Sequence, residues 1–410
     1  MRQLSSMRPL LLLSIVAFVP AARAQTDVVD EASVIRAIEN DPRTDRIAAE
    51  IDAAAATVRA AAIRAEPRLA GDREEVFPSG GGVATNYLRL VIPIDLSGRR
   101  GRAVDAARAG VDAARAQGDV ERFGLVVDAL RVFRGAQYHR LRVALMTAER
   151  AALVRVVDIV AERAKAGDAS GYDQQRLLLE LTAYDDGIAA AAIELRASQR
   201  RLATLLDRSG ALVDASGDLQ PGAPPALDAI AAEALARRGD YRAAKARIAA
   251  ANEERSAAGR TWVPTLELTV GGMSQDAGTD RAFGYVAGLA LNLPIFDRGS
   301  AAAARAEAAR RAATADARWL ERYVPDAIRT AHETWVARIE QARSFQATQL
   351  ARLAQLLASA EAAYRDGGGT IVELLDAYRS AREARLHELE LRRDASLAEL
   401  DLWLALGGRP

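Results

Sequence analysis

Two glycine-rich turns, 200 residues apart, each place a hydroxyl three residues before an acid. Ser170 precedes Asp173, and Thr370 precedes Glu373. At this spacing the hydroxyl caps a helix and the acid reaches back to the capping residue. Asp376 lies one turn beyond Glu373, so these two carboxylates share a helix face, where they can attract cations. Each turn is therefore expected to start a helix, and its acids could attract cations in addition to capping that helix.

Side chains suited to catalysis or metal binding do not gather elsewhere in the sequence. His139, His332 and His387 are far apart in helix-forming stretches, which favours surface or packing roles over metal ligation. Residues 80–82 are three glycines without the lysine that follows in a phosphate-binding loop. The chain has no cysteine, which excludes disulfides, thiolate metal sites and a cysteine nucleophile. We therefore expect no enzymatic activity, no bound metal and no cofactor.

Composition indicates long helices and gives no electrostatic reason to expect a nucleic-acid partner. The 55 basic and 55 acidic side chains cancel. Aromatic residues make up only 5% of the chain, and alanine, arginine, glutamate and leucine dominate. This bias is typical of elongated helical proteins rather than of proteins with a large globular core.

Residues 1–24 have the pattern of a secretory signal peptide. A positively charged start precedes the apolar run Leu10–Val19, and Ala22-Arg23-Ala24 supplies a small-x-small cleavage site. The run is too short to span a membrane, and no later stretch of about 18 uncharged apolar residues follows it. We expect the mature chain to leave the cytoplasm without a transmembrane helix.

The sequence repeats itself at a period of about 200 residues. The stretch RIAAEIDAAAATVRAAAIRAEPRL matches RAAKARIAAANEERSAAGRTWVPTL, with Pro67 opposite Pro264. Further along, LVIPIDLSGRRG matches LNLPIFDRGSA. We predict two repeats and a glycine- and proline-rich linker between them: 25–206, 227–410 and the linker 207–226.

Each repeat is expected to contain a helix, a strand pair, a very long helix, a sharp turn and a shorter helix. Pro325 predicts a kink in the second long helix. The alternation of side chains over 281–293 is typical of a strand with one apolar face, although a soluble amphipathic strand would show it too. Part of 67–77 could instead be an exposed loop. The expected ranges are helix 43–65, strand pair 67–95, helices 99–165 and 171–206, helical residues 227–260, strand pair 264–296, and helices 299–365 and 370–406.

Such a chain needs partners. Four strands cannot close a barrel, and an open sheet edge cannot face lipid with its backbone groups unsatisfied. Three chains would supply twelve strands, an even number within the range of membrane barrels. The predicted fold class is mainly α with a small β part. Duplicated long helical hairpins form an α-barrel, and four strands per chain contribute to a trimeric 12-stranded transmembrane β-barrel.

Two motifs carry a family resemblance. NLPIFDRG ends at Gly299, and TIVELLDA runs from Thr370 to Ala377 after a tyrosine and a glycine turn. With the doubled unit, they make the chain resemble the TolC-like outer-membrane efflux protein family across essentially the whole mature sequence. The resemblance implies a homotrimer in lipid of the outer membrane, with a periplasmic tunnel that docks on a periplasmic adaptor protein and an inner-membrane pump.

The resemblance also implies roles for individual residues. Acids of the TIVELLDA-like segment and of its first-repeat counterpart would line the periplasmic mouth; here these are Glu373, Asp376 and Asp173. Tyr364 matches a position that helps to hold the mouth shut, but the usual basic partner falls at Gly369, which puts that contact in doubt. The alternative is that Glu373 only caps a helix and that Asp376 is only a solvated surface acid.

Three functions remain open on the sequence. Scaffold segments around LVIPIDLSGRRG and AGDASGYD look most like the outer-membrane components of heavy-metal cation efflux systems, which suggests a passive duct for metal cations. A duct for type I secretion or drug efflux is the first alternative. A soluble periplasmic coiled-coil adaptor is the second, but adaptors lack two strand pairs at one end of duplicated hairpins.

Overall fold

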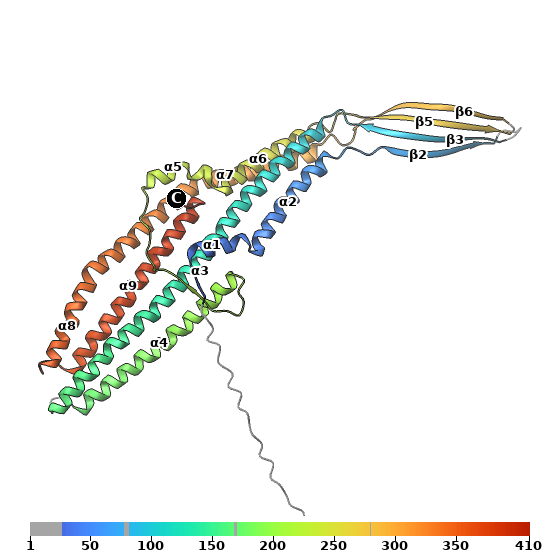
Figure 1. Cartoon of the computed structure of the whole chain (residues 1–410). Helices are drawn as coiled ribbons and strands as arrows, with labels where there is room; N and C mark the ends of the chain where they lie inside the picture. Colours follow the sequence, from blue (N-terminus) through green and yellow to red (C-terminus); the bar gives the residue numbers. More distant parts are fainter. Residues whose placement is uncertain (1–26, 78–81, 168–169, 279) are drawn as a thin grey trace, which may run out of the picture.

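The computed structural model describes residues 27–77, 82–167, 170–278 and 280–410. The predicted signal peptide and two of the three glycines of 80–82 lie outside the described residues. The molecule is elongated: a narrow sheet extends from one end of a long helical body (Figure 1). The predicted fold class, mainly helical with a small sheet, is confirmed. Within the described ranges, no helix combines the length and the apolar composition needed to cross a membrane.

The first repeat folds as a short strand, two helices, a strand hairpin and a helical hairpin. Its longest helix has 68 residues, about 100 Å at 1.5 Å per residue. It begins and ends at glycines with left-handed backbone, Gly98 (φ 63°) and Gly167 (φ 85°), which allow the chain to turn sharply at both ends. The elements are β1 (Asp27–Val29), α1 (Glu31–Glu39), α2 (Pro42–Ala62), β2 (Arg68–Val76), β3 (Val83–Ile94), α3 (Arg99–Ala166) and α4 (Gly171–Leu205).

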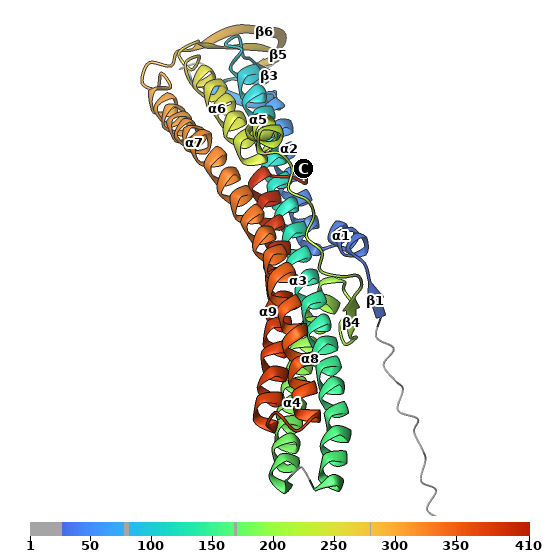
Figure 2. The same cartoon turned by 90° about the vertical axis from the view of Figure 1, so that its left-hand side faces the viewer.

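The second repeat has the same order after a small strand in the connecting segment. The elements are β4 (Val213–Ala215), α5 (Leu227–Arg237), α6 (Gly239–Ala258), β5 (Thr265–Ala277), β6 (Asp280–Asn292), α7 (Ser300–Phe345), the π-helical turn η1 (Gln346–Leu350), α8 (Ala351–Arg365) and α9 (Ile371–Leu406). Both helical hairpins turn at the end of the body opposite to the sheet (Figures 1 and 2).

The four long strands form one antiparallel sheet in the order β2-β3-β5-β6. The middle pair joins the two repeats, since β3 of the first pairs with β5 of the second from Val83 opposite Ala277 to Ile94 opposite Leu266. The sheet therefore depends on both repeats.

The helical body is held together by contacts between the repeats. Helix α3 packs against α9, and a buried cluster of Val127, Leu130, Leu400 and Trp403 lies between them. A second cluster packs the turn of one hairpin against the turn of the other and includes Leu177, Leu374 and Leu375 among others.

The second long helix continues through Pro325, and Val324 and Ile328 on either side of it are buried in the body. The kink expected at Pro325 stays a prediction. The regular pattern is broken further along, where residues 346–350 form a π-helical turn that no proline or glycine signals.

The helices predicted over 227–260 are present as α5 and α6, which are separated at Arg238, whose side chain donates to the carbonyl of Ala405 at 2.5 Å. Two other predicted bounds are wrong. Strand β6 stops at Asn292, ahead of Pro294, which has no N–H for a strand ladder. The helix predicted over residues 43–65 ends at Ala62 rather than at residue 65.

The predicted linker 207–226 is not entirely irregular. It contains β4, which pairs in parallel with β1 from Asp27 opposite Val213 to Val29 opposite Ala215. This small sheet lies beside the middle of the helical body with α1, which the sequence did not indicate (Figure 2).

Candidate functional site

The four-stranded sheet has one apolar face and one polar face, because its register aligns side chains of one kind across the strands. On the apolar face Leu289 of β6 lies opposite Leu268 of β5, which lies opposite Ile92 of β3. This face is uncovered in a single chain: Phe283 is 80% exposed and Tyr285 is 87% exposed. Exposed apolar patches of this kind mark interaction or membrane surfaces.

The apolar face has the extent of a membrane-facing wall. From Phe283 to Leu291 the strand covers about 26 Å, the scale of the apolar band of about 25 Å in membrane barrels. Nearer the hairpin ends the same face of β2 becomes polar, at Arg73 and Glu75. The apolar members include Leu69, Leu88, Leu90, Ile92, Leu266, Leu268, Val270, Phe283, Tyr285, Leu289 and Leu291.

The opposite face carries charged and hydrogen-bonding side chains. Arg89 of β3 donates from Nε to Asp72 of β2 at 3.1 Å, and Asn292 of β6 donates to Glu267 of β5 at 2.8 Å. A sheet with lipid on one side and water on the other requires this division.

Each outer strand of the sheet has a partner on one side only. Strands β2 and β6 form the two edges, and β6 is 13 residues long with an apolar face. Long edges of this kind are usually shortened, charged or covered in soluble proteins, because their unpaired N–H and C=O groups recruit other strands. Joining β6 of one chain to β2 of the next would satisfy both edges.

The second predicted turn residue, Glu373, forms a capping box at the start of α9. The Thr370 N–H donates to Glu373 Oε2 at 2.8 Å, and the Glu373 N–H donates to the Thr370 hydroxyl at 3.3 Å. These bonds from Thr370 hold the pKa of the Glu373 carboxyl below its usual range. Asp376 follows on the exposed side of the same helix. The capping role and a role at an opening are compatible, because the carboxylate stays exposed.

The other two predicted residues meet at the same end of the body. The Tyr364 hydroxyl, at the end of α8, donates to Asp173 Oδ2 at 3.3 Å, while the Ser170 hydroxyl donates to Asp173 Oδ1 at 3.2 Å. The Tyr364 side chain is buried, and this burial, with the nearby Asp173 charge, raises the pKa of its phenol. Tyr364 and Asp173 thus connect the two hairpin turns.

The comparison with known families gives a match to the second half of the chain. Residues 230–408, which include most of α5 and all of β5, β6 and α7 to α9, match the model described as outer membrane efflux protein. The second half of the chain is therefore similar to outer membrane efflux proteins. The location that these similarities support is the outer membrane.

Two curated relatives are similar to the chain. Nodulation protein T of Rhizobium leguminosarum bv. trifolii is 27% identical over 293 residues, which cover 68% of this chain and 62% of that protein. The pyoverdine export outer membrane protein OpmQ of Pseudomonas putida is 28% identical over 337 residues, 77% of this chain and 68% of that protein. The chain thus spans less than two thirds of the length of the first of these relatives.

Solved channel structures share the fold. A crystal structure of CusC superposes with a TM-score of 0.75 at 19% identity and covers 98% of this chain and 99% of that one. The agreement extends over both repeats, so the chain shares the α-barrel and β-barrel fold of these structures.

Arg163 is the residue at the turns that the sequence reasoning missed. Its guanidinium lies over the Tyr364 ring, 4.6 Å from the centroid, and Nη1 donates to the Tyr364 carbonyl at 2.6 Å. It comes from the end of α3, so a basic contact to this tyrosine exists although Gly369 cannot supply one. The signal available in the sequence was the position of Arg163 next to the matching glycine turn.

Ion pairs continue the connection between the hairpins away from the turns. Arg379 of α9 donates from Nε to both oxygens of Glu180 of α4, at 3.0 and 2.9 Å, and the Glu180 side chain is only 5% exposed. The Tyr184 hydroxyl donates to the Tyr378 carbonyl at 3.4 Å. The two hairpins are therefore linked by polar contacts as well as by packing.

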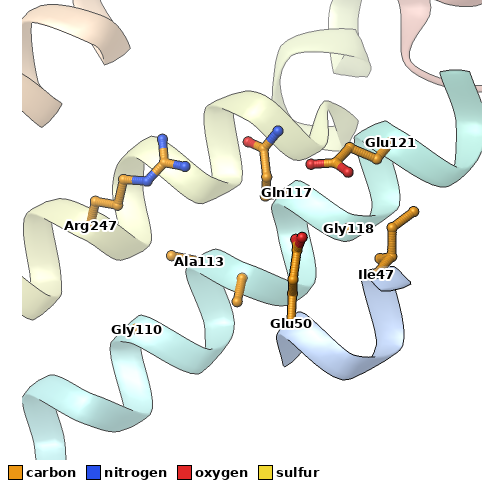
Figure 3. A pocket seen from close by; sticks show the side chains of 9 residues that line it. Ile47, Glu50, Gly110, Ala113, Gln117, Gly118, Glu121 and Arg247 are labelled. Atoms are coloured by element: carbon orange, nitrogen blue, oxygen red, sulfur yellow. The ribbon is translucent and has the colours of Figure 1, made fainter. Parts of the chain in front are cut away.

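A cavity of about 320 Å³ between α2, α3 and α6 has a structural explanation (Figure 3). The small residues of α3 let the neighbouring helices approach: a Cβ at Gly118 would come within 2.9 Å of Ile47. Both acids that line the cavity, Glu50 and Glu121, pair with Arg46. Among the described residues, no group of three or more histidine, aspartate and glutamate side chains could hold a metal ion.

Proposed function

We propose that three copies of this chain form a passive duct from the periplasm to the exterior, as the outer-membrane subunit of a tripartite efflux system. The observation that carries the proposal is the sheet: its two open edges and its division into an apolar and a polar face. Three such sheets joined edge to edge make a closed barrel of twelve strands, which leaves no unpaired backbone facing lipid. The long hairpins continue the wall as a tunnel.

The open end of the tunnel is proposed to lie at the hairpin turns. Three copies of Glu373, Asp376 and Asp173 around one axis would crowd carboxylates and give the opening a preference for cations. Raising the pH would increase their mutual repulsion and favour opening. The contacts of Tyr364 would oppose that opening. A periplasmic adaptor and an inner-membrane pump are the proposed partners at this end, and the proposal assigns no catalytic residue.

For the exported cargo we propose only a chemical class. The scaffold motifs favour metal cations, whereas the relative named for pyoverdine export favours a small organic molecule. A duct for type I secretion or drug efflux remains the alternative. Removing the protein from its native cell should sensitise the cell to the exported class, so growth against divalent metal salts and against organic toxins separates these proposals.

Conductance in planar bilayers tests the duct itself. The purified full chain should produce discrete conductance steps with a preference for cations. The variant Glu373→Gln with Asp376→Asn should lower that preference, whereas Glu39→Gln with Asp45→Asn, which removes two exposed charges from α1 and α2, should leave it unchanged. A protein that stays in the soluble periplasmic fraction and forms no channels would instead support the adaptor.

A further inference from the structure

A cavity of about 730 Å³ lies where the sheet joins the helical body. Its walls come from four segments: the chain after α2, the end of β3, the start of α3 and the connection between α6 and β5. Residues on these walls include Ile63, Arg64, Ile94, Arg99, Arg100 and Arg260. The cavity combines basic side chains with apolar ones.

Three arginines of this cavity lie outside the close ion pairs of the described part of the chain. Arg64, Arg99 and Arg100 make no ion pair there, although the neighbouring Arg102 pairs with Glu253 at 3.0 Å. Arg260 points its guanidinium at the carbonyls of residues 97 and 98, at 3.5 and 3.3 Å.

One acid, Asp95, lies on the cavity wall and offsets part of this charge. It accepts a hydrogen bond from the Ser97 N–H at 2.9 Å, and the charges of Arg99 and Arg100 also help to lower the pKa of its carboxyl. Four guanidinium groups against a single carboxylate leave the cavity with an excess of positive charge, which is complementary to an anion.

The start of α3 adds to that excess. Its first turn contains Arg99, Arg100 and Arg102 and no acid. Arginines are unfavourable at this position, because the N-terminal end of a helix already carries partial positive charge. The matching helix of the second repeat, α7, begins instead with Ser300 and four alanines. A positively charged first turn is therefore a feature of the first repeat alone, and a bound anion would offset its charge.

The apolar wall of the cavity continues the apolar face of the sheet. Ile92 and Ile94 line the cavity and follow Leu88 and Leu90 along the same face of β3. At the same junction Trp262 is 62% exposed and Phe296 is fully exposed. Exposed aromatic side chains at this level are typical of a membrane–water interface.

We propose that this cavity binds the phosphate headgroup of an anionic glycerophospholipid in the leaflet next to the helical body. Arg64, Arg99 and Arg100 would hold the phosphate, and the isoleucines of β3 would contact the acyl chains. Clustered basic side chains beside a membrane surface recognise anionic headgroups in this way. The proposal rests on insertion of the sheet in the membrane and is independent of what the duct exports.

Lipid retention by the full chain in a non-ionic detergent tests the proposal. Native mass spectrometry would follow titrations with phosphatidylglycerol, phosphatidylcholine and inorganic phosphate. We expect phosphatidylglycerol to bind about tenfold more tightly than phosphatidylcholine, and the variant Arg64→Gln/Arg99→Gln/Arg100→Gln to lose that difference. The variant Arg196→Gln/Arg200→Gln/Arg201→Gln, which removes the same charge from α4, should keep it.

The results that overturn the proposal are distinct from a failure of the duct. Equal retention of the two lipids by the unmodified protein would overturn it without any variant. Equal phosphatidylglycerol binding by the Arg64→Gln single variant and the unmodified protein would also contradict the proposal. Arg64 is exposed in the connection after α2, so we expect this variant to fold normally. If millimolar inorganic phosphate displaced phosphatidylglycerol completely, the cavity would be a site for a free anion and not for a lipid headgroup. Conductance measured on the same preparations reports separately on the duct.

Discussion

The Tyr364 hydroxyl donates a hydrogen bond to the Asp173 carboxylate 3.3 Å away and so connects the last turn of α8 to the first turn of α4. One residue belongs to each repeat, and Arg163 lies against the other side of the tyrosine. The contact lies at the end of the body where the proposed opening is, so breaking it should change how readily the hairpins separate.

The variant Tyr364→Phe should make the duct open more readily. It keeps the buried ring and removes the hydroxyl, at a cost of about 1 kcal/mol, or about fivefold in the equilibrium between closed and open states. Single-channel recordings should show a higher open probability. The control is Tyr378→Phe, which removes a bond to Glu361 within one repeat. Equal open probabilities for the unmodified protein and Tyr364→Phe would remove this contact from the closure.

The capping box at Thr370 should weaken in acid. The pKa of Glu373 is lower in the folded protein than its ordinary value, because Thr370 donates hydrogen bonds to the carboxylate. A lowered pKa stabilises the folded state at neutral pH, and this contribution is lost as the pH falls through the folded-state pKa. Amide hydrogen exchange at the start of α9 should therefore lose protection below about pH 4.

Two variants make that measurement specific. Glu373→Gln retains the shape of the capping side chain without a titrating group, so its protection should change less with pH. Asp376→Asn leaves the capping box intact and should behave like the unmodified protein. Identical pH profiles for all three proteins would contradict the assignment of the effect to Glu373.

The two faces of the sheet should respond differently to charge. Ala287 lies on the apolar face of β6 and Val286 on the polar face. An arginine facing the middle of the bilayer costs about 2–4 kcal/mol, so Ala287→Arg should reduce the amount of protein folded in the outer membrane. Val286→Arg should insert normally and shift ion selectivity towards anions. The opposite pattern would show that the faces are assigned the wrong way round.

The buried ion pair between the repeats should be costly to break. Arg134 of α3 lies 2.8 Å from Glu399 of α9, and their side chains are 8% and 11% exposed. Arg134→Met leaves a buried carboxylate alone and should lower the free energy of unfolding by about 3 kcal/mol. Arg134→Met/Glu399→Gln should recover part of that loss in urea unfolding.

Arg131 supplies the matched comparison for this pair. It lies on the same helix and pairs with Asp401 at 2.7 Å, but its side chain is 37% exposed and that of Asp401 is 56% exposed. Arg131→Met should therefore cost less than about 1 kcal/mol. Equal losses for the two variants would mean that burial does not control the strength of these pairs.

Much of this architecture follows from periodicity and repetition. The alternation over 281–293 predicts a strand with one apolar face, and the second copy of the unit predicts the matching hairpin that β3 and β5 join. The glycine turns and their hydroxyl–acid spacing predict where α4 and α9 begin, since capping is a local interaction.

The features that the sequence did not indicate depend on contacts between distant segments. The three-residue strands β1 and β4 are too short to show a period, and their pairing is fixed by a buried cluster with α3 and α4. The contact of Arg163 with Tyr364 exists only once the two hairpin turns are side by side.

Cross-linking between strand edges tests the trimeric barrel most directly. The chain has no cysteine of its own, so Ala287→Cys on β6 can be combined in turn with cysteines at positions 69–75 of β2. If β6 of one copy lies beside β2 of the next, at least one combination will give a covalent trimer on non-reducing gels of isolated outer membranes. Monomer at every position, in protein that reaches the outer membrane, would contradict the barrel.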